Sequence, residues 1–337
     1  MPTTRRDLLR LAAGAAISAA VTSCSGAGTD AGAKGHRTSP ATTRPASPTN
    51  PPAGPPRDFA GRPRPGELYY GASLPADRSL SQWEHLLGAP LALHRSYFTP
   101  DPDETAQMSR QCDDDLTAGR LPHVSMKPPG TWADVASGRF DDWLRGIFGS
   151  LAQPGRPIFF TLHHEPENDA GPPGMQAADF VAMQRRVIGL GGDLAPAVTV
   201  VPVLQHWTFD PLHGGADPRS WIVEEAAVLG VDVYNPWSPT NGKLWRTFGS
   251  RVDEVTRWVG DTPLAIGEYG CRQDPADPGS VAAWLRDAAD YARTHDIVSM
   301  SYFNSGQNSP DGSTELYGPA EQTFAELLGS TWVARPD

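Results

Sequence analysis

The segment IFFTLHHEPEN, residues 158–168, decides the fold. Its first five residues form a largely apolar run typical of a buried parallel strand, and the run ends abruptly in imidazoles and carboxylates. Helices cover both faces of such strands, and barrel enzymes keep their reactive groups where the strands end. A second segment, PLAIGEYG at residues 263–270, repeats the pattern. Glu165 and Glu268 are therefore predicted to form a pair of reactive carboxylates.

Eight strand-like runs alternate with helical patterns, in which apolar residues such as Leu80, Trp83 and Leu87 recur at helix spacing. A further helix is expected at residues 221–226. Eight alternations with right-handed crossovers predict an α/β fold, a (β/α)8 TIM barrel. The alternative, an open doubly wound sheet, is disfavoured because no Gly-x-Gly-x-x-Gly follows the first strand. The strands are expected at residues 68–73, 91–97, 121–126, 158–164, 198–204, 231–234, 264–268 and 297–303.

Residues 1–23 are predicted to be an export signal and are excluded from the fold. Residues 4–10, TRRDLLR, resemble a twin-arginine signal, and the apolar run at 11–21 is shorter than the roughly 20 residues of a membrane span. Residues 21–24, VTSC, resemble a lipobox, which predicts lipidation of Cys24. The alternative is an ordinary signal peptide with an incidental cysteine. Lipid at Cys24 would hold the exported protein on the bacterial cell surface; without it the protein would be extracellular.

Residues 24–66 are predicted to be an extended linker. Residues 25–66 hold nine prolines and seven glycines, no Val, Ile, Leu or Met, and one aromatic residue, Phe59. Such a segment buries too little apolar surface to offset the entropy of ordering it. Residues 67–337 are long enough for one complete barrel, so a single domain is expected there.

The charge balance excludes some partners. The formal net charge is −11, and removal of residues 1–23, with three Arg and one Asp, brings it to −11 − 2 = −13. An acidic chain of this kind is not expected to bind nucleic acid. Cys112 and Cys271 are expected to lie on distant parts of a barrel, which disfavours a disulfide between them. We expect a monomer that requires no cofactor.

Strand counting places Glu165 after the fourth strand and Glu268 after the seventh. This placement resembles the retaining glycosidases of clan A, whose acid/base follows strand 4 and whose nucleophile follows strand 7. The pair His164-Glu165 resembles the acid/base motif of glycoside hydrolase family 26, the β-mannanase family, and residues 266–270 are similar to that family's nucleophile segment. The resemblance extends over roughly residues 68–330.

The resemblance implies a secreted or surface-anchored retaining glycoside hydrolase that cleaves β-linked polysaccharide, with β-mannan as the leading substrate. Glu165 would be the acid/base and Glu268 the nucleophile of a double displacement. That mechanism requires carboxyl groups about 5–5.5 Å apart, whereas an inverting enzyme separates them by roughly 6.5–9.5 Å.

Further residues are candidates for binding the sugar. His164 would orient a carboxylate or contact a hydroxyl, and Tyr234 matches the family tyrosine that hydrogen-bonds the nucleophile. For Trp207 and Trp237, stacking on sugar rings and simple packing are equal alternatives. The other candidates, at the ends of strands 2 and 8, are Tyr97 and Tyr302.

Three departures from the family leave the substrate open. Residues 166–169, PEND, stand where the family has Asn-Gly and an aromatic residue. The strand-8 tryptophan has no counterpart, because residues 301–304 are SYFN. Residues 125–128, SMKP, provide no match for the family's histidine after strand 3.

Two other functions fit parts of the sequence. A metal-dependent hydrolase could use His163, His164 and Glu165, although neighbouring residues of a regular strand point to opposite sides and no His-Glu-x-x-His is present. Asp232 was expected to lie too deep within its strand to be a ligand. A non-catalytic glycan-binding lipoprotein on a barrel fold is the second alternative, since fold does not fix function.

Overall fold

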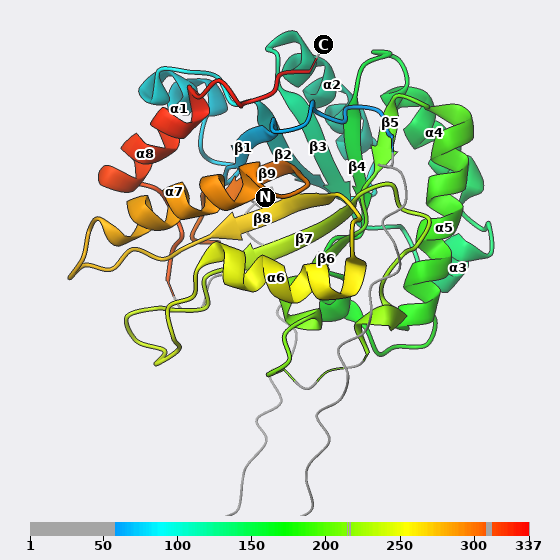
Figure 1. The fold of residues 1–337 in the computed structure, drawn as a ribbon. Helices are drawn as coiled ribbons and strands as arrows, with labels where there is room; N and C mark the ends of the chain where they lie inside the picture. Colours follow the sequence, from blue (N-terminus) through cyan, green and yellow to red (C-terminus); the bar gives the residue numbers. More distant parts are fainter. Residues whose placement is uncertain (1–57, 214, 216, 308–311, 337) are drawn as a thin grey trace, which may run out of the picture. The chain divides into compact units, whose positions relative to one another are not determined.

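The computed structural model describes residues 58–213, 215, 217–307 and 312–336. The predicted export signal, Cys24 and the linker up to residue 57 lie outside these ranges. The described residues form one parallel sheet of nine strands with helices around its outer face (Figure 1). No helix within the described ranges combines the length and the apolarity that a membrane span requires.

The helices and strands alternate along the chain. The strands are β1 (Tyr69–Ser73), β2 (Leu93–Phe98), β3 (Leu121–Met126), β4 (Ile158–Leu162), β5 (Val198–Val200), β6 (Val203–Gln205), β7 (Leu229–Tyr234), β8 (Leu264–Gly270) and β9 (Ile297–Phe303). The helices are α1 (Leu80–Leu87), α2 (Pro102–Thr117), α3 (Trp132–Ala136), α4 (Asp141–Leu151), α5 (Ala177–Leu194), α6 (Phe248–Val259), α7 (Ser280–Arg293) and α8 (Pro319–Leu328). Short 3₁₀ helices are η2 (Pro166–Asp169), η3 (His206–Thr208) and η4 (Pro218–Ser220).

The sheet closes into a barrel because β5 and β6 together form one strand, the fifth of eight. The strand order is β5-β4-β3-β2-β1-β9-β8-β7-β6, so its two ends are β5 and β6, which only Val201 and Pro202 separate in the chain. Val201 donates its amide hydrogen to Phe160 on β4, and Gly230 on β7 donates to Pro202. One broken strand therefore bridges β4 and β7, because proline has no amide hydrogen to continue the ladder. The predicted barrel is confirmed, with all eight predicted strand positions filled.

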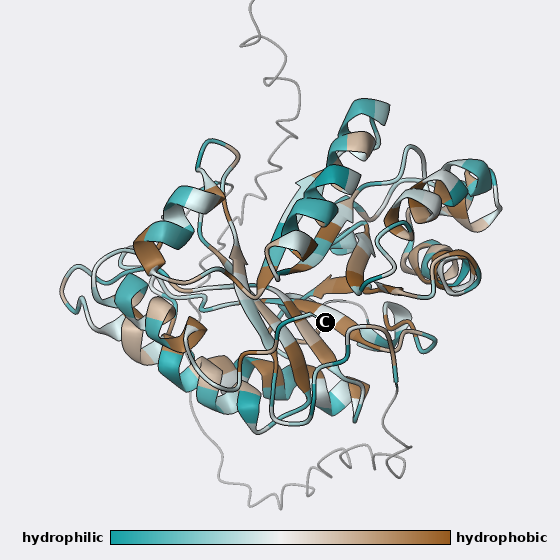
Figure 2. Ribbon diagram, turned by 90° about the horizontal axis from the view of Figure 1, so that it is seen from above, coloured by the Kyte–Doolittle hydropathy of each residue, from teal (hydrophilic) through white to brown (hydrophobic). Residues whose placement is uncertain are grey.

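Two apolar layers result from the strand alternation. The larger core lies between the strands and the helices, which turn their apolar sides inward and their polar sides outward (Figure 2). A smaller core fills the ring near the strand starts, with Leu93, Leu121 and Phe159 among its members. Further along the same strands the inward positions become polar, as at Arg95 and His123. The interior is thus packed with apolar side chains at one end and lined by polar and charged ones at the other.

Residues 58–66 belong to the folded part, although the linker was predicted to extend to residue 66. The ring of Phe59 packs 6.1 Å from that of Phe159, and Arg62 forms a 2.8 Å ion pair with Asp296. The Thr199 hydroxyl donates to the carbonyl of Ala60. These contacts cover the apolar end of the ring, away from the candidate site.

The crossover between β6 and β7 contains η3 and η4 but no α-helix in its described residues, so the helix predicted at 221–226 was wrong. Its buried residues, Trp221, Val223 and Ala226, are spaced by two and three, a pattern that no helical face presents. Trp221 packs against Trp132 and Phe180 instead.

Cys112 and Cys271 are both buried and free, so the expected absence of a disulfide between them agrees with the structure. Burial raises the pKa of the Cys271 thiol to about 12 and raises that of Cys112 as well. Neither thiol is therefore a reactive nucleophile.

Candidate active site

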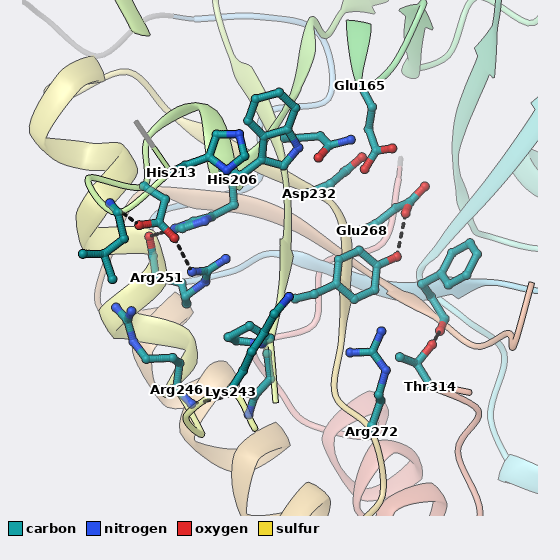
Figure 3. Close-up of a pocket in the computed structure, with 18 of the residues that line it drawn as sticks. Glu165, His206, His213, Asp232, Lys243, Arg246, Arg251, Glu268, Arg272 and Thr314 are labelled. Atoms are coloured by element: carbon teal, nitrogen blue, oxygen red, sulfur yellow. Dashed lines mark hydrogen bonds and ion pairs between the residues drawn. The ribbon is translucent and has the colours of Figure 1, made fainter. Parts of the chain in front are cut away.

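A pocket of about 1050 Å³ opens where the parallel strands end. Glu165, Asp232 and Glu268 lie together at one side of it, on segments that follow or end β4, β7 and β8 (Figure 3). The structure therefore brings together the two carboxylates that the sequence identified and adds a third that it did not.

A bulge in β8 turns Glu268 into the pocket. Val231 on β7 pairs with Ile266, but Asp232 pairs with Glu268, so Gly267 is an extra residue in β8. Ala265 faces the inside of the ring and Tyr269 faces the helices. Without the bulge, regular alternation from Ala265 would point Glu268 toward the helices.

Two tyrosine hydroxyls hold the carboxylate of Glu268. Tyr97 donates to Oε1 at 2.6 Å and Tyr234 donates to Oε2 at 2.6 Å. Burial and the charge of Glu268 raise the pKa of both phenols well above the usual value, which keeps the donating hydrogens in place. Arg95 in turn donates from Nε to the Tyr97 oxygen at 3.1 Å. This chain of hydrogen bonds fixes the orientation of Glu268.

The segment after β4 leaves the regular strand conformation at two residues. His163 has a φ of 64° and Glu165 a φ of 48°. Both lie in the left-handed region, which residues other than glycine seldom adopt. His163 consequently turns away from the pocket, where its Nδ1 accepts from the indole of Trp132 at 2.8 Å. Its Nε2 then carries the hydrogen and donates to Asp169 at 2.8 Å. Burial lowers the pKa of His163, in accord with a neutral ring.

Glu165 lies in an environment that favours its protonated form. Burial, followed by the charges of Glu268 and Glu167, raises its pKa to about 8. The amide of Asn168 donates to its Oε2 at 3.0 Å, and its own backbone N–H donates to Val203 on β6. One oxygen each of Glu165, Asp232 and Glu268 lie within 4.8 Å of one another. Neighbouring carboxylates in such different surroundings can divide the roles of acid and nucleophile.

Asp232 is the pocket residue that sequence reasoning missed, because it was expected to lie too deep within its strand. Its side chain lines the pocket yet is only 3% exposed, and among the described residues no donor reaches either of its oxygens. Burial, then the charges of Glu268 and Glu165, raise its pKa well above the usual value. The sequence signal that could have found it is its position two residues before Tyr234, on the same side of β7.

Arg95 supplies a buried positive charge beneath the carboxylates. It is 1% exposed, and it donates from one terminal nitrogen to Nε2 of His123 at 2.7 Å. Its other terminal nitrogen has no partner among the described residues. The nearby charges of Asp232 and Glu268 favour its cationic form, so Arg95 offsets part of their mutual repulsion.

Glu167 connects two segments that border the pocket. Its Oε1 accepts from the backbone N–H of Gln205 at 3.0 Å and from the hydroxyl of Thr208. Burial raises its pKa to about 7. It therefore ties the segment after β4 to the end of β6, which carries Gln205 and the pocket residues that follow it.

The other predicted sugar-binding residues divide into two groups. Tyr97, His164, Trp207 and Tyr234 line the pocket. Burial lowers the pKa of His164 to about 3, so this ring is neutral. Trp237 instead borders a neighbouring pocket of about 520 Å³, with its ring 5.3 Å from that of Trp245.

Tyr302 was wrongly predicted to contact the substrate. It is fully buried in the layer between strands and helices, and its hydroxyl donates to the carbonyl of Thr314 at 2.7 Å. Its neighbour Phe303 lines the pocket. The reason is strand alternation, because consecutive residues of β9 face opposite sides of the sheet.

The proposed metal ligands of the sequence analysis do not come together. Both ring nitrogens of His163 are engaged, by Trp132 and Asp169, which leaves none for a metal. Two other groups have the spacing of a metal site: Glu165 with Asp232 and Glu268, and His206 with Asp210 and Glu254. The first offers only carboxylate oxygens, the ligand type of Mg²⁺, Ca²⁺ or Mn²⁺.

No family model and no curated protein match this sequence. Several solved structures have a similar fold. An exo-β-1,4-mannosidase from Opitutaceae bacterium strain TAV5 is 16% identical with a TM-score of 0.57, over 80% of this chain and 61% of that one. A GH26 β-mannanase from Bacteroides ovatus is 12% identical with a TM-score of 0.56, over 80% of this chain and 90% of the other.

An endo-β-1,4-mannanase of Cellulomonas fimi, solved as a double mutant, is 12% identical with a TM-score of 0.52, over 80% of this chain and 73% of that one. This chain thus spans less than two thirds of the exo-mannosidase but most of the two mannanases. At such identities the likeness shows the fold alone, and that fold is one which GH26 mannanases and related glycosidases share.

Proposed function

We propose that this protein is a retaining glycoside hydrolase that cleaves β-linked polysaccharide. The supporting observation is the approach of Glu165 and Glu268 to within 4.8 Å, from two strand ends and in contrasting environments. This close approach of one oxygen from each residue suits the retaining arrangement, whose carboxyl groups lie closer together than those of an inverting enzyme.

In the first step the carboxylic acid of Glu165 gives its proton to the glycosidic oxygen while an oxygen of Glu268 attacks C1. The bond between C1 and the glycosidic oxygen breaks, and an ester joins the sugar to Glu268. In the second step Glu165, now a carboxylate, takes a proton from water as the water oxygen attacks C1 and the ester breaks. One water is added across the bond, and both carboxyl groups return to their starting states.

The roles follow from the surroundings of the two groups. An acid must hold a proton near neutral pH, and a pKa of about 8 allows Glu165 to do so. A nucleophile must be correctly oriented, and the donors Tyr97 and Tyr234 each hold one oxygen of Glu268. Asp232, within 4.8 Å of both groups, lies where a sugar hydroxyl would supply the donor that its oxygens lack.

β-Mannan is the leading substrate. Two observations support it: the His164-Glu165 pair, which resembles the family 26 motif, and the likeness of the fold to a β-mannanase and a β-mannosidase. Trp207 on the pocket wall offers an indole face for a sugar ring.

The test is release of reducing sugar from β-mannan, β-xylan and mixed-linkage β-glucan by the full-length chain and by Glu165→Ala and Glu268→Ala variants of confirmed folding. Either change should lower kcat by several orders of magnitude. General acid–base catalysis contributes about 10²–10⁴-fold, and the loss of the nucleophile in Glu268→Ala should exceed that range. Azide should restore Glu165→Ala on substrates with activated leaving groups, because the glycosyl–enzyme then needs no general base. Unchanged rates in both variants would reject the assignment.

A carboxylate-bound divalent cation is the second candidate for this site, since three acidic groups converge there. Dialysis against a chelator separates the two mechanisms. The double displacement predicts unchanged kcat after chelation, whereas a metal-dependent hydrolase would lose activity and regain it with added Mg²⁺ or Mn²⁺. Non-catalytic glycan binding, the third candidate, predicts no product release and sugar binding unaffected by Glu268→Gln.

We also propose export by the twin-arginine route and lipidation at Cys24. The sequence of residues 4–24 supports both. Labelled palmitate should be incorporated into the wild-type chain and not into a Cys24→Ala variant, which should leave the membrane fraction. Equal labelling of the two would disprove the anchor.

A further inference from the structure

The pocket separates its charges. Its three converging carboxylates lie at one side, and in Figure 3 the labelled basic side chains lie away from them along the rest of the lining. The lysine and the three arginines among them are called the basic wall, which consists of Lys243, Arg246, Arg251 and Arg272. The loop between β7 and α6 carries the first two, α6 carries the third, and the segment after β8 carries the fourth.

Two members of the basic wall are held in place by acidic partners. Arg251 forms a 3.1 Å ion pair with Asp210, and Arg246 forms one of 2.9 Å with Glu254. Arg246 also donates to the hydroxyl and the carbonyl of Ser250. These contacts orient the guanidinium groups before any ligand arrives, which reduces the entropy lost on binding.

Lys243 is the least constrained member of the basic wall. The whole sequence contains three lysines, Lys34, Lys127 and Lys243, and the structure describes the last two. Lys127 is paired with Asp169, whereas Lys243 forms no ion pair within the described ranges. A rare residue type thus stands in the pocket with its charge available to a ligand.

A neutral polysaccharide does not require this arrangement. Neutral sugars are bound by hydrogen-bonding groups and aromatic faces, which Gln205, Trp207 and Asn235 already provide in the same pocket. Moreover, the chain is acidic, with 39 acidic residues against 28 basic ones, so its general field repels anions. On the basic wall, Asp210 and Glu254 offset two of the four positive charges, and the remaining excess of positive charge would locally oppose that repulsion.

We propose that the pocket binds a negatively charged glycan, with an acidic group on a sugar next to the cleaved bond placed against Lys243, Arg246 and Arg272. This inference rests on the proposed glycosidase function and changes its substrate class from the neutral β-mannan to an acidic β-linked glycan. Guanidinium groups donate charge-assisted hydrogen bonds to carboxylate, sulfate or phosphate oxygens, and an ammonium adds a point charge. Among the described residues, neither Lys243 nor Arg246 forms an ion pair with Glu165, Asp232 or Glu268, so the two charged regions keep separate tasks.

Matched substrates test the inference. The first pair is β-1,4-mannuronan and β-1,4-mannan, and the second is β-1,4-glucuronan and β-1,4-glucan. In each pair the acidic polymer has a carboxylate at C6 where the neutral polymer has a hydroxymethyl group. A β-1,4-glucan with C6 sulfate distinguishes the kind of anion. The full-length enzyme should give a kcat/KM at least about tenfold higher on the acidic member of a pair, the usual effect of one charge-assisted hydrogen bond. That preference should fall as salt is added.

Variants of Lys243 locate the effect. Lys243→Gln should lower kcat/KM about tenfold on the acidic polymer and leave the neutral polymer within about twofold. Lys243→Arg, which keeps the charge, should retain the preference. Arg286→Gln is the charge-matched control, because Arg286 lies outside the pocket, where it pairs with Glu326 on α8. A loss by Lys243→Gln that is equal on both polymers, or a wild-type preference for the neutral one, would overturn the inference.

Binding separates this inference from the proposed function. Calorimetric titration of the wild-type chain and of Glu268→Gln with acidic and neutral oligosaccharides requires no turnover. Tighter binding of the acidic oligosaccharide without hydrolysis of any polymer would reject the glycosidase while supporting the anionic ligand. Hydrolysis with no binding preference would do the reverse.

Discussion

Tyr97 on β2 donates a 2.6 Å hydrogen bond to Oε1 of Glu268 on β8, two intervening strands away in the sheet. The sequence analysis assigned Tyr97 to the substrate, but this contact makes it a partner of Glu268, the proposed nucleophile. Tyr234 holds the other oxygen from β7. Because each oxygen of Glu268 has one donor, the carboxylate can neither rotate nor leave the pocket without breaking a charged hydrogen bond.

Replacement of either tyrosine by phenylalanine should slow the reaction without unfolding the protein. Tyr97→Phe or Tyr234→Phe removes one donor of the charge-assisted type, for which about 1.5–3 kcal/mol, or roughly 10–100-fold in kcat, is expected. The measurement is kcat on an activated aryl glycoside, with circular dichroism to confirm folding. A loss confined to KM would show that the hydroxyl contacts substrate and does not position Glu268.

The dependence of kcat/KM on pH should report the proton of Glu165. The acid is active while protonated, so activity should fall above its pKa of about 8. Glu167→Gln removes a negative charge that favours the protonated form, so the pKa of Glu165 should decrease and the basic limb should move to lower pH. Glutamine keeps an oxygen that can accept from Gln205 and Thr208. An unmoved basic limb would show that Glu167 has no electrostatic influence on the acid.

Stability should also depend on pH through Glu167. Its folded-state pKa of about 7 exceeds that of an unfolded glutamate, about 4.3, so the folded state binds more protons between these values. The free energy of unfolding contributed by this group therefore decreases as pH rises from about 4.3 to 7. Urea titrations at several pH values should show a smaller decrease for Glu167→Gln than for the wild type. Parallel curves for the two proteins would contradict the assignment.

Gly267 should tolerate no side chain. A Cβ there would lie 2.5 Å from an oxygen of Asp232 and 3.1 Å from a methyl group of Val203. Gly267→Ala should cost about 1–3 kcal/mol of unfolding free energy, measured by denaturant titration. Gly189→Ala is the control, because a Cβ at this α5 position meets nothing within 4 Å, and it should be neutral or slightly stabilising. If the clash is with Asp232, the added Asp232→Ala change should recover part of the loss.

Trp132→Phe should affect both stability and turnover. The change leaves Nδ1 of the buried His163 without its donor, which should cost about 1–3 kcal/mol. Because His163 and Asp169 lie in the segment that carries Glu165, kcat should fall as well. Trp83→Phe is the control, since this buried indole donates to Glu321 on α8, remote from the pocket. Equal effects of the two variants on kcat would show that the histidine contact has no part in positioning Glu165.

The sequence by itself determined the barrel and the two glutamates. Buried parallel strands are recognisable because they are short, apolar and separated by helical patterns, which are local properties of the chain. Glu165 comes three residues after the end of β4 and Glu268 lies near the end of β8, so counting strands was enough to place both at one end of the ring. The broken fifth strand did not disturb the count, because its two halves are consecutive in the sequence.

Only the tertiary structure decided which side chains face the pocket. Regular alternation would turn Glu268 outward, and the bulge at Gly267 that turns it inward depends on the register of β8 against β7. Strand alternation separates Tyr302 from Phe303 and puts Asp232 on the same side of β7 as Tyr234, but the way the sheet closes decides which side is the inner one. Strand register, left-handed backbone conformation and long-range ion pairs depend on contacts between segments far apart in the chain. No local sequence pattern therefore predicts them.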